Sequence, residues 1–293
     1  MMSYLCIDIG ATKTLVGVGE EDFLSVKSLH TCDFLEDPSI AFQDMNLEEV
    51  EMAGIANPGP LDREKGIIYP PNIDKEKVKI RDLFGNYLDE FFLINDCTAG
   101  VVGEYVYGDD PPPDMVYVTI STGIGGGVIT DGRSLEGSCG NFAEIGHLVV
   151  GGERKCSCGG EGHWESYCSG ANLPEFAEEI TSEDFENTHS VFDAYDKGDE
   201  GAEKVIALMR SYNAKGIANL INAYDPELVV FGGSVALNNF GVVVEGLEEE
   251  IQKEVLSRLP EMRPASLGER SVLYGLLAIC RQEGPCTSIA GLK

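Results

Sequence analysis

Four side chains that bind transition metals gather in one glycine-rich stretch. Two cysteines and two histidines fall within 17 positions, namely His147, Cys156, Cys158 and His163. Two Cys and two His form a common ligand set for a tetrahedral structural zinc ion. In a reducing compartment, a Cys-x-Cys pair flanked by histidines is more often a metal site than a pair of free thiols. The stretch therefore predicts a zinc site, with Cys168 as the rival of His163 for the fourth ligand position.

A second candidate site lies near the N-terminus, where an acidic residue precedes a small-residue turn. Asp8 ends an apolar strand, a place where an unpaired carboxylate is costly. Gly10 lets the backbone approach a ligand closely, and Thr12 adds a hydroxyl and an N–H. Together these groups suit a phosphate chain and its magnesium ion. A hairpin turn with an incidental Asp explains the pattern equally well, so both interpretations stay open at this point.

A run of glycines marks another turn. Residues 123–127 hold four glycines in five positions, directly after a strand-like segment. Glycine costs backbone entropy, so a cluster needs a steric reason, and backbone N–H groups lining an anion are the usual one. The run is not a P-loop, because no Gly-Lys-Ser/Thr follows it. Gly232 and Gly233, after a further buried strand, offer one more place of close approach, suited to the flat face of a base.

The pair Asn95-Asp96 follows the apolar segment 91–94. Asn can both donate to and accept from a ligand hydroxyl, and an Asp at the end of a strand could take a proton from an attacking alcohol. An ordinary Asp is ionised at pH 7, so this role needs no raised pKa. The alternative is a helix N-cap, where both residue types are favoured.

The charge of the chain limits its partners. The 293 residues include 50 acidic and 21 basic side chains, for a formal net charge of −29. Nucleic acids and anionic membranes are recognised through Lys and Arg, so neither is an expected partner. No run approaches the ~18 apolar residues of a membrane span. The acidity suits a solvated surface, with adaptation to a salty cytoplasm as the alternative.

The nine cysteines are expected to be reduced. The N-terminus has no basic and apolar leader pattern and continues directly into a strand-like segment, which predicts a cytoplasmic protein. Apart from Cys156 and Cys158, the cysteines are scattered, which favours free buried thiols over disulfides.

Two segments share a strand–turn–strand plan that indicates an internal duplication and two related domains. Strands are expected at 5–9 and 14–18 around the turn 10–13, and at 115–120 and 128–130 around the turn 121–127. The proline-rich, acidic segment 108–114 is the expected boundary between the domains. Further expected elements are a strand at 26–34, a helix at 208–224, a strand at 228–231, an acidic helix at 246–256 and a buried helix at 271–280.

In this order, the motifs resemble those of the ROK family of sugar kinases, within the sugar kinase–actin–heat-shock ATPase fold. The matching segments are two phosphate motifs (8–13 and 121–127), a Pro-Gly sugar loop (57–60), Pro71-Asn72, Asn95-Asp96, a Glu-x-Gly-His motif (144–147), a zinc motif (156–165) and an adenosine-side motif (229–234). Three features depart from the family pattern. His163 replaces the third Cys, Ser121 replaces a common Gly, and only about 16 residues separate the third strand from the strand before Asn57.

The resemblance implies an α/β protein with two domains around a central cleft. The small domain would comprise residues 1–108, joined by a C-terminal helix within 270–293, and the large domain residues 109–269 with the zinc loop and nucleotide site. We also expect a homodimer or a higher homo-oligomer.

The resemblance further implies ATP-dependent phosphorylation of a hexose, most closely of glucose, at the 6-hydroxyl. Asp96 would be the catalytic base, magnesium would lie near Asp8, and zinc would be structural. The implied sugar-binding residues are Gly59, Asn72, Asn95, Asp96, Glu144, His147 and Glu165. The implied nucleotide-binding residues are Asp8, Gly10, Ala11, Thr12, Lys13, Thr122, Gly123, Gly125, Gly232 and Gly233.

Other functions stay open within the same motifs. N-acetylmannosamine, N-acetylglucosamine, fructose and allose kinases share nearly all of them, and polyphosphate could replace ATP as the donor. Some members of the family are transcriptional repressors with a helix-turn-helix domain ahead of the first phosphate motif, where this sequence has seven residues before Asp8. An ATPase that activates a partner through an iron–sulfur cluster would have no use for the sugar motifs.

Overall fold

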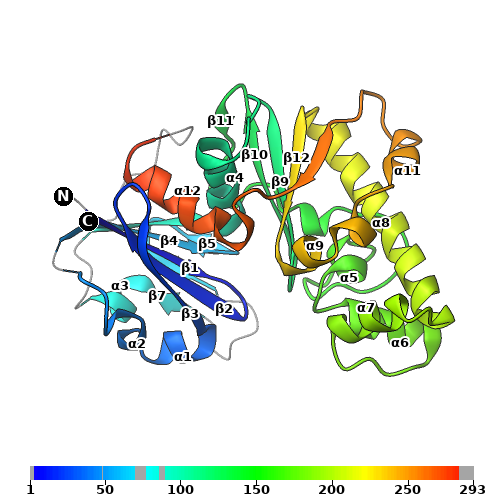
Figure 1. Ribbon diagram of the computed structural model, residues 1–293, viewed down its shortest axis with the longest axis horizontal. Helices are drawn as coiled ribbons and strands as arrows, with labels where there is room; N and C mark the ends of the chain where they lie inside the picture. Colours follow the sequence, from blue (N-terminus) through cyan, green and yellow to red (C-terminus); the bar gives the residue numbers. More distant parts are fainter. Residues whose placement is uncertain (1–2, 48, 70–76, 86–89, 284–293) are drawn as a thin grey trace. The chain divides into compact units, whose positions relative to one another are not determined.

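The computed structural model describes residues 3–47, 49–69, 77–85 and 90–283, and the chain forms two compact units (Figure 1). The first unit comprises residues 1–113, 127–142 and 269–293. The second unit comprises residues 114–126 and 143–268. Segment 127–142 thus belongs to the first unit, whereas residues 114–126 belong to the second.

The first unit is built on a five-stranded sheet in the order β3-β2-β1-β4-β8. The first three strands are antiparallel neighbours, and β4 and β8 run parallel to β1. Its strands are β1 (Ser3–Ile9), β2 (Lys13–Gly19), β3 (Phe23–His30), β4 (Val50–Asn57) and β8 (Phe91–Asn95), with a small sheet of β5 (Leu61–Asp62), β6 (Ile67–Ile68) and β7 (Val78–Lys79) beside them. The expected strand 26–34 is wrong at its end, because Thr31 begins a helix.

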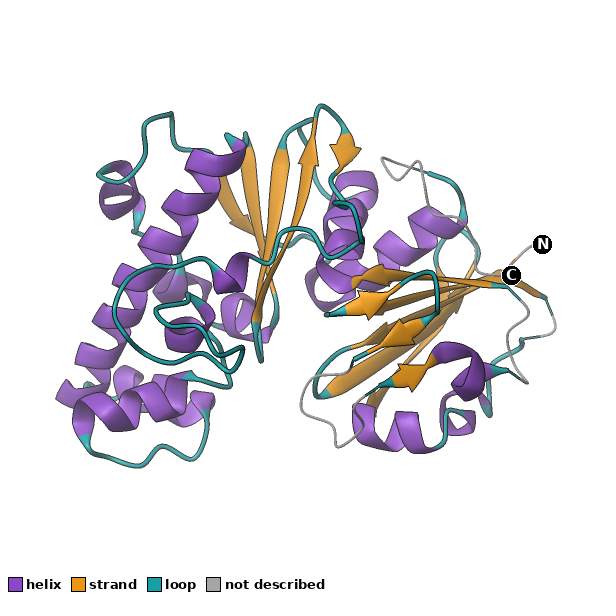
Figure 2. Cartoon of the chain, turned by 180° about the vertical axis from the view of Figure 1, so that it is seen from behind, coloured by secondary structure: helices purple, strands orange, loops and turns teal. Residues whose placement is uncertain are grey.

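Helices cover both faces of this sheet, as Figure 2 shows. One face carries α1 (Thr31–Glu36), α2 (Ser39–Phe42) and α3 (Ile80–Phe84), whose aromatic residues Phe34, Phe42 and Phe84 join the core of the unit. The other face carries α4 (Asp96–Tyr107) and α12 (Ser271–Cys280), which pack closely on each other. A Cβ on Gly275 would lie 1.8 Å from the carbonyl oxygen of Ala99, so glycine is needed for this approach. The helix expected at 271–280 is confirmed.

A second five-stranded sheet has the order β11-β10-β9-β12-β13. Within the second unit, β12 is parallel to both β9 and β13. The strands are β9 (Met115–Ile120), β10 (Ile124–Thr130), β11 (Arg133–Ser134), β12 (Leu228–Gly232) and β13 (Glu261–Pro264). The strand expected at 115–120 is confirmed, whereas β10 begins earlier than expected, inside the glycine run itself.

The longest helix of the second unit is α8 (Glu200–Tyr224), and most of the other helices pack against it. The others are α5 (Glu165–Cys168), α6 (Leu173–Thr181), α7 (Thr188–Asp196), α9 (Ser234–Asn238), α10 (Phe240–Val243) and α11 (Glu248–Gln252), with short 3-10 turns at Ile145–His147 and Gly268–Arg270. Helix α8 begins eight residues before the expected 208, because Asp199 caps it by accepting from the N–H of Ala202 at 2.8 Å. The acidic helix expected at 246–256 is shorter, since Gly246 has a φ of +77° before it.

Among the described residues, no helix is both long enough and apolar enough to cross a membrane.

Candidate active site and metal site

The carboxyl ends of three parallel strands bring the polar residues of the first unit to one edge of its sheet. Asp8 in β1 is paired with Ala56 in β4, and Asn57 in β4 is paired with Asn95 in β8. Asp96 follows directly as the first residue of α4. Ligands of α/β proteins bind at such edges, because side chains and helix N-termini converge there. The register therefore brings together residues that are almost 90 positions apart in the sequence.

Asn95 is both a helix cap and a link to the predicted sugar loop. Its Oδ1 accepts from the N–H groups of Cys97 at 2.9 Å and Thr98 at 3.1 Å, so the N-cap alternative is correct for this residue. Its Nδ2 donates to the carbonyl oxygen of Pro58 at 3.2 Å. The neighbouring Asp96 accepts from the Cys97 N–H through Oδ1 at 2.7 Å. This hydrogen bond from the Cys97 N–H fixes the direction of the Asp96 side chain.

The two acidic residues at this edge have raised pKa values. Burial raises the pKa of Asp8 to about 8, and the negative charge of Asp96 adds to the increase, while Lys13 opposes it. Burial also raises the pKa of Asp96, although hydrogen bonds from Cys97 act in the opposite direction. A raised pKa at Asp96 was not expected from the sequence, because burial at a strand end depends on the surrounding fold. Two carboxylates close together favour a cation or a proton between them.

Two asparagines that the sequence analysis did not assign hold the sugar loop. Asn57 is fully buried; its Nδ2 donates to the Ile9 carbonyl at 2.9 Å and its Oδ1 accepts from the Gly59 N–H at 3.2 Å. Gly59 has a φ of +87°, which a residue with a side chain rarely adopts. Asn141 accepts from the N–H of Leu61 at 3.1 Å and donates to its carbonyl at 3.2 Å. Asn57 belongs to the Pro-Gly sugar-loop motif at 57–60. Asn141 has no sequence signal, since its partner Leu61 is 80 residues away.

The predicted sugar residue Asn72 lies outside the described residues. Glu144 caps the 3-10 turn that carries His147, and its side chain is exposed. The second unit contains the other three predicted sugar residues, Glu144, His147 and Glu165. They lie in or next to the segment that carries the predicted metal ligands.

The first turn, at 10–13, closes through its own backbone and one threonine. The Gly10 N–H donates to the Lys13 carbonyl at 3.1 Å, and the Thr31 hydroxyl donates to the Gly10 carbonyl at 2.8 Å. Thr12 and Ala11 lie at the tip, and Thr12 is exposed. The Lys13 ammonium pairs with Glu269 at 2.8 Å, and both side chains are about half exposed. The turn thus keeps the hairpin of β1 and β2 tight while its tip faces solvent.

The second turn, at 121–124, is tied to a residue of the zinc motif. The Ile124 N–H donates to Glu165 Oε2 at 3.0 Å. A Cβ on Gly123 would lie 2.7 Å from the same oxygen, so a side chain there would push the Glu165 carboxylate aside. The N–H of Ala171, just after α5, donates to the Thr122 carbonyl at 3.0 Å. Packing within the protein therefore already explains glycine at position 123.

Other glycines of the predicted nucleotide site also have neighbours within the protein. A Cβ on Gly232 would meet the Tyr117 hydroxyl at 2.0 Å, and one on Gly233 would meet Thr119 Oγ1 at 2.5 Å. Gly233 also has a φ of +83°. Gly125 lies on β10. Gly232 and Gly233 thus allow the end of β12 to lie tightly on β9.

The predicted metal ligands lie together in the second unit, and they are His147, Cys156, Cys158 and His163. Two thiol sulfurs and two ring nitrogens all lie within 4.8 Å of one another. Cys156 Sγ is 3.7 Å from His147 Nδ1. Cys158 Sγ is 3.3 Å from His163 Nδ1. Ligand atoms around a tetrahedral zinc lie roughly 3.3–3.8 Å apart, given metal–ligand bonds of about 2.0–2.3 Å. The donor set and the two S–N distances above therefore fit a zinc ion.

The loop that carries these ligands has a glycine-dependent shape. The Cys156 N–H donates to the Gly160 carbonyl at 2.8 Å, which closes a turn around Cys158. A Cβ on Gly160 would lie 2.4 Å from the His163 ring, so a side chain there would displace this ligand. Cys168, the rival ligand, is buried in α5, and its thiol donates to the Met209 carbonyl at 3.5 Å. The geometry among the described residues thus favours His163 as the fourth ligand.

The only tryptophan of the chain anchors the loop to α8. Trp164 lies between His163 and Glu165 in the sequence, and its side chain is fully buried. Its Nε1 donates to Asn213 Oδ1 at 2.8 Å. A Cβ on Gly216 would lie 2.3 Å from the indole ring, so α8 needs a glycine there. This anchor was not predicted from the sequence, although a lone Trp inside a motif was an available signal.

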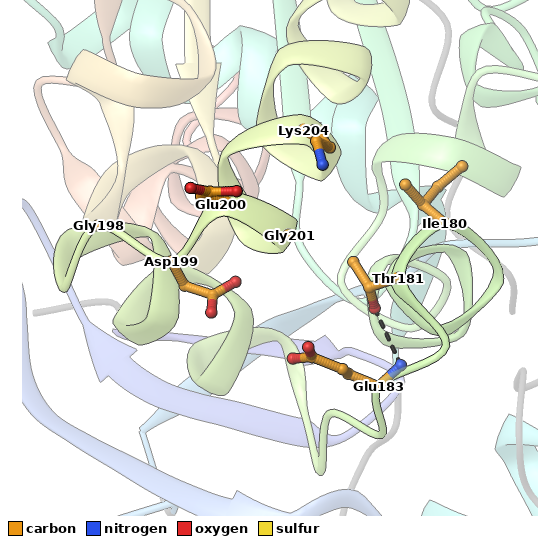
Figure 3. A pocket seen from close by; sticks show the side chains of 8 residues that line it. All are labelled: Ile180, Thr181, Glu183, Gly198, Asp199, Glu200, Gly201 and Lys204. Atoms are coloured by element: carbon orange, nitrogen blue, oxygen red, sulfur yellow. Dashed lines mark hydrogen bonds between the residues drawn. The ribbon is translucent and has the colours of Figure 1, made fainter.

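A hollow of about 570 Å³ in the second unit lies elsewhere, between the ends of α6 and α8 (Figure 3). Two of its polar side chains already have local structural partners. Thr181 Oγ1 accepts from the Glu183 N–H at 3.1 Å, and Asp199 caps α8. The hollow contains none of the predicted site residues.

Comparison with known proteins shows the family of the chain over nearly its whole length. The sequence model of the ROK family matches residues 4–283. The glucokinase of Pyrobaculum calidifontis is 32% identical over 282 residues, which cover 95% of both chains. The ROK hexokinase of Thermus thermophilus superposes with a TM-score of 0.78 at 31% identity, over 96% of this chain and 99% of that chain.

A second solved structure, a ROK family glucokinase from Streptomyces griseus in complex with glucose and AMPPNP, has a TM-score of 0.79 at 25% identity. The superposition covers 96% of this chain and 99% of that chain. These likenesses confirm the expected α/β fold class. Because the family model covers residues 4–283, which is nearly the whole chain, the chain belongs to the ROK family.

Proposed function

We propose that this protein is an ATP-dependent hexokinase that transfers the γ-phosphate of ATP to the 6-hydroxyl of glucose. The observation that carries the proposal is the edge of the first sheet, where Asp8 and Asp96 lie beside a sugar loop tied down by Asn95. Its relatives include glucokinases, and one similar structure was solved with glucose and an ATP analogue. A carboxylate beside an amide-rich loop suits a neutral polyol that must lose one proton.

In this proposal, Asp96 accepts the proton of the 6-hydroxyl while the sugar oxygen attacks the γ-phosphorus. A new P–O bond forms, the bond to the β-phosphate oxygen breaks, and ADP leaves with the electron pair. The hydrogen bond from the Cys97 N–H holds one oxygen of Asp96, so the other oxygen is the proton acceptor. The raised pKa makes Asp96 a stronger base than an exposed Asp once it is ionised.

Magnesium fits the residues at this edge. Asp8 is a half-buried carboxylate whose pKa is raised to about 8 by burial and by Asp96, and a divalent cation would relieve both effects. We assign Asp8 to hold the magnesium of ATP, which when bound supplies positive charge to the phosphate groups. The backbone of the two turns, with Lys13 paired to Glu269, contributes little positive charge of its own.

Zinc fits the Cys/His cluster, and we assign it a structural role. The cluster would hold the loop between His147 and Glu165, two residues to which we assign sugar contacts together with Glu144, Gly59 and Asn95. Asn72 completes the proposed sugar set. Because the metal fixes the sugar side, its loss should affect sugar binding more than ATP binding.

A coupled assay with ATP and a panel of hexoses tests the activity directly. Glucose is expected to give the highest kcat/KM, with N-acetylmannosamine, N-acetylglucosamine, fructose and allose as competitors. Polyphosphate in place of ATP tests the donor. No phosphorylation of any hexose by the purified magnesium- and zinc-containing protein would contradict the proposal.

The Asp96→Asn variant tests the base. Because Asn keeps the shape but cannot take the proton, kcat should fall by ~10²–10⁴, the usual contribution of a positioned general base. Glucose binding, measured by calorimetry, and the unfolding transition should stay near those of the wild type. A variant that keeps more than about a tenth of the wild-type kcat would remove Asp96 from this role.

Assembly and location are further parts of the proposal. We expect a homodimer or a higher homo-oligomer, which light scattering after gel filtration measures. We expect the protein to act in the cytoplasm, where ATP is supplied and thiols such as those of the Cys/His cluster stay reduced.

A further inference from the structure

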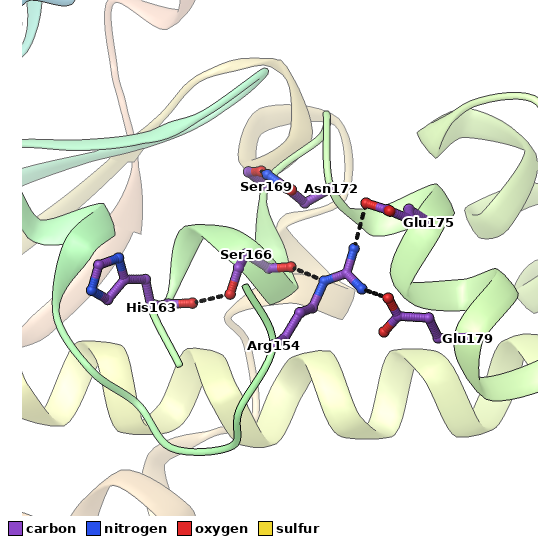
Figure 4. A network of polar contacts seen from close by, with 7 residues as sticks. All are labelled: Arg154, His163, Ser166, Ser169, Asn172, Glu175 and Glu179. Carbon is purple, nitrogen blue, oxygen red and sulfur yellow. Dashed lines mark hydrogen bonds and ion pairs between the residues drawn. The ribbon is translucent and has the colours of Figure 1, made fainter. Parts of the chain in front are cut away.

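One arginine connects the segment between His147 and His163, here called the Cys/His loop, to the helix that carries Glu165. The Arg154 side chain is 8% exposed, and its Nε donates to the carbonyl oxygen of Ser166 in α5 at 2.7 Å. The two ends of the guanidinium pair with Glu175 at 2.7 Å and with Glu179 (Figure 4). Arg154 precedes Cys156 by two residues, so this contact joins the start of the loop to its end.

The backbone of Arg154 reinforces the same connection. Its carbonyl accepts from the Gly162 N–H at 2.9 Å, across the loop. Its own N–H donates to the Tyr167 hydroxyl at 3.1 Å. The guanidinium also lies over the Phe176 ring, 5.8 Å from its centre. None of these contacts uses a metal ligand atom.

The hydrogen bond to Ser166 satisfies a need of this short helix. In a continued helix, the N–H of Gly170 would donate to the Ser166 carbonyl, but it donates instead to the Ser121 carbonyl at 2.7 Å. A carbonyl left over at a helix C-terminus needs another donor, and a positive charge is favoured there. Arg154 supplies both.

The helix in turn positions the residues on either side of it. The Ser166 hydroxyl donates to the His163 carbonyl at 2.7 Å, and Figure 4 shows this bond next to that of Arg154. Glu165, the first residue of α5, accepts from the Ile124 N–H of the second turn. A continuous series of contacts thus leads from Arg154 to Glu165.

We propose that Arg154 is a positioning residue that holds α5, and with it Glu165 and His163, in the arrangement needed for sugar binding. The inference rests on the proposed hexokinase function and adds a residue that touches neither sugar nor metal. The essential bond is the buried one to Ser166. The acidic partners Glu175 and Glu179 have side chains 69% and 52% exposed, and exposed ion pairs contribute little.

Three variants of the zinc-loaded protein separate these contributions. Arg154→Met removes the charge and the donors but keeps an apolar stem of similar length. Arg154→Lys keeps the charge but lacks the planar fork that serves several acceptors at once. The double variant Glu175→Gln/Glu179→Gln is the matched control, since it leaves the bond to Ser166 intact.

The measurements are the KM values for glucose and ATP, kcat, and the rate of zinc release to a colorimetric chelator. Loss of one charge-assisted hydrogen bond to a buried group predicts a roughly ten-fold rise in the glucose KM for Arg154→Met. We expect its ATP KM and kcat to stay within about three-fold of the wild type and its zinc release to be faster. Arg154→Lys should lie between the wild type and Arg154→Met, and the control should stay within about two-fold of the wild type.

Zinc release needs no catalytic activity, so it separates this inference from the proposed function. If the wild type phosphorylates no hexose, the proposed function fails, while faster zinc release from Arg154→Met still supports the loop contact. An unchanged glucose KM with unchanged zinc release in Arg154→Met would overturn the inference. An equal rise of the glucose and ATP KM values would also overturn it, because it would indicate general disruption rather than positioning of α5.

Discussion

The two turns of the proposed phosphate site share a plan but differ in what holds them. The turn at 10–13 is closed by its own backbone and by Thr31, and its Lys13 pairs with exposed Glu269. The turn at 121–124 is held by a side chain from a different motif, Glu165, and by segments that follow α5. The first is a self-contained hairpin beside two carboxylates, whereas the second depends on the Cys/His loop.

This difference assigns separate tasks to the two turns. The first provides negative charge for a metal ion, because Asp8 and Asp96 raise the cost of leaving that edge without a cation. The second would link the proposed nucleotide residues to the proposed sugar residues, since Glu165, one of the proposed sugar contacts, accepts from the backbone of this turn. Perturbing the first turn should therefore affect metal use and stability, and perturbing the second should affect sugar binding.

After Asp96→Asn, the largest effect is expected for Asp8→Asn. Loss of the proposed magnesium ligand should lower kcat/KM by at least ~10², since an ion that offsets phosphate charge contributes several kcal/mol. The apparent magnesium affinity should weaken in parallel, and a magnesium titration of the steady-state rate measures it. The wild type and Asp8→Asn should bind glucose alone with similar affinity. Equal magnesium dependence in both proteins would contradict the assignment.

The raised pKa of Asp8 predicts a pH effect in metal-free protein. Because the folded pKa is about 8 and the unfolded pKa is near 4, the folded state holds a proton that the unfolded state releases between these values. The stabilisation is present at low pH and is lost as the pH rises toward 8. Urea unfolding in chelator at pH 5 to 8 should show the wild type losing stability relative to Asp8→Asn. Parallel curves would contradict the raised pKa.

The next effect is on stability and belongs to the first turn. In Gly10→Ala, the new Cβ would lie 2.8 Å from the Lys13 carbonyl oxygen, and a backbone atom cannot move away without opening the hairpin. The free energy of unfolding should fall by ~1–3 kcal/mol, the usual cost of overpacking. Denaturant unfolding measures the change. A variant as stable as the wild type would show that this turn is looser than described.

Removal of zinc should weaken mainly the binding of the sugar. Cys156→Ser replaces a thiolate with a weak ligand, so the protein should lose its zinc. The glucose KM should then rise roughly ten-fold, about 1.4 kcal/mol, while the ATP KM changes less. Metal analysis and steady-state kinetics on the same preparation test this. Fully active wild type with less than about a tenth of an equivalent of zinc would remove the structural role.

The smallest effect is expected for Gly123→Ala in the second turn. Its Cβ would lie 2.7 Å from Glu165 Oε2, the end of a movable side chain, so folding should be nearly unaffected. The displaced carboxylate should raise the glucose KM by ~3–5-fold, within the range of one lost hydrogen bond. Gly10→Ala is expected to lower mainly the stability of the protein, whereas Gly123→Ala is expected to weaken mainly the binding of glucose. If Gly123→Ala lowers stability as much as Gly10→Ala does, the proposed difference between the turns is wrong.

Local patterns were sufficient for much of the fold. The strand at 115–120 and the helix at 271–280 begin and end as the apolar patterns predict. The Cys/His cluster was also predicted, because its ligands are close in sequence and their spacing limits how far apart they can lie. Errors fell where a cap or a turn residue decides the boundary, as at Asp199 before α8 and Gly246 before α11.

Only the tertiary structure decided which residues far apart in the chain contact one another. The bond of Asn141 to Leu61, the raised pKa of Asp8 beside Asp96, and the approach of Glu165 to Gly123 have no local sequence signal. A sequence specifies backbone preference over a few residues, and side-chain type determines what chemistry is available. Which groups meet, and how far burial shifts their charge, depends on strand register and on the return of the chain, and these follow from packing of the whole unit.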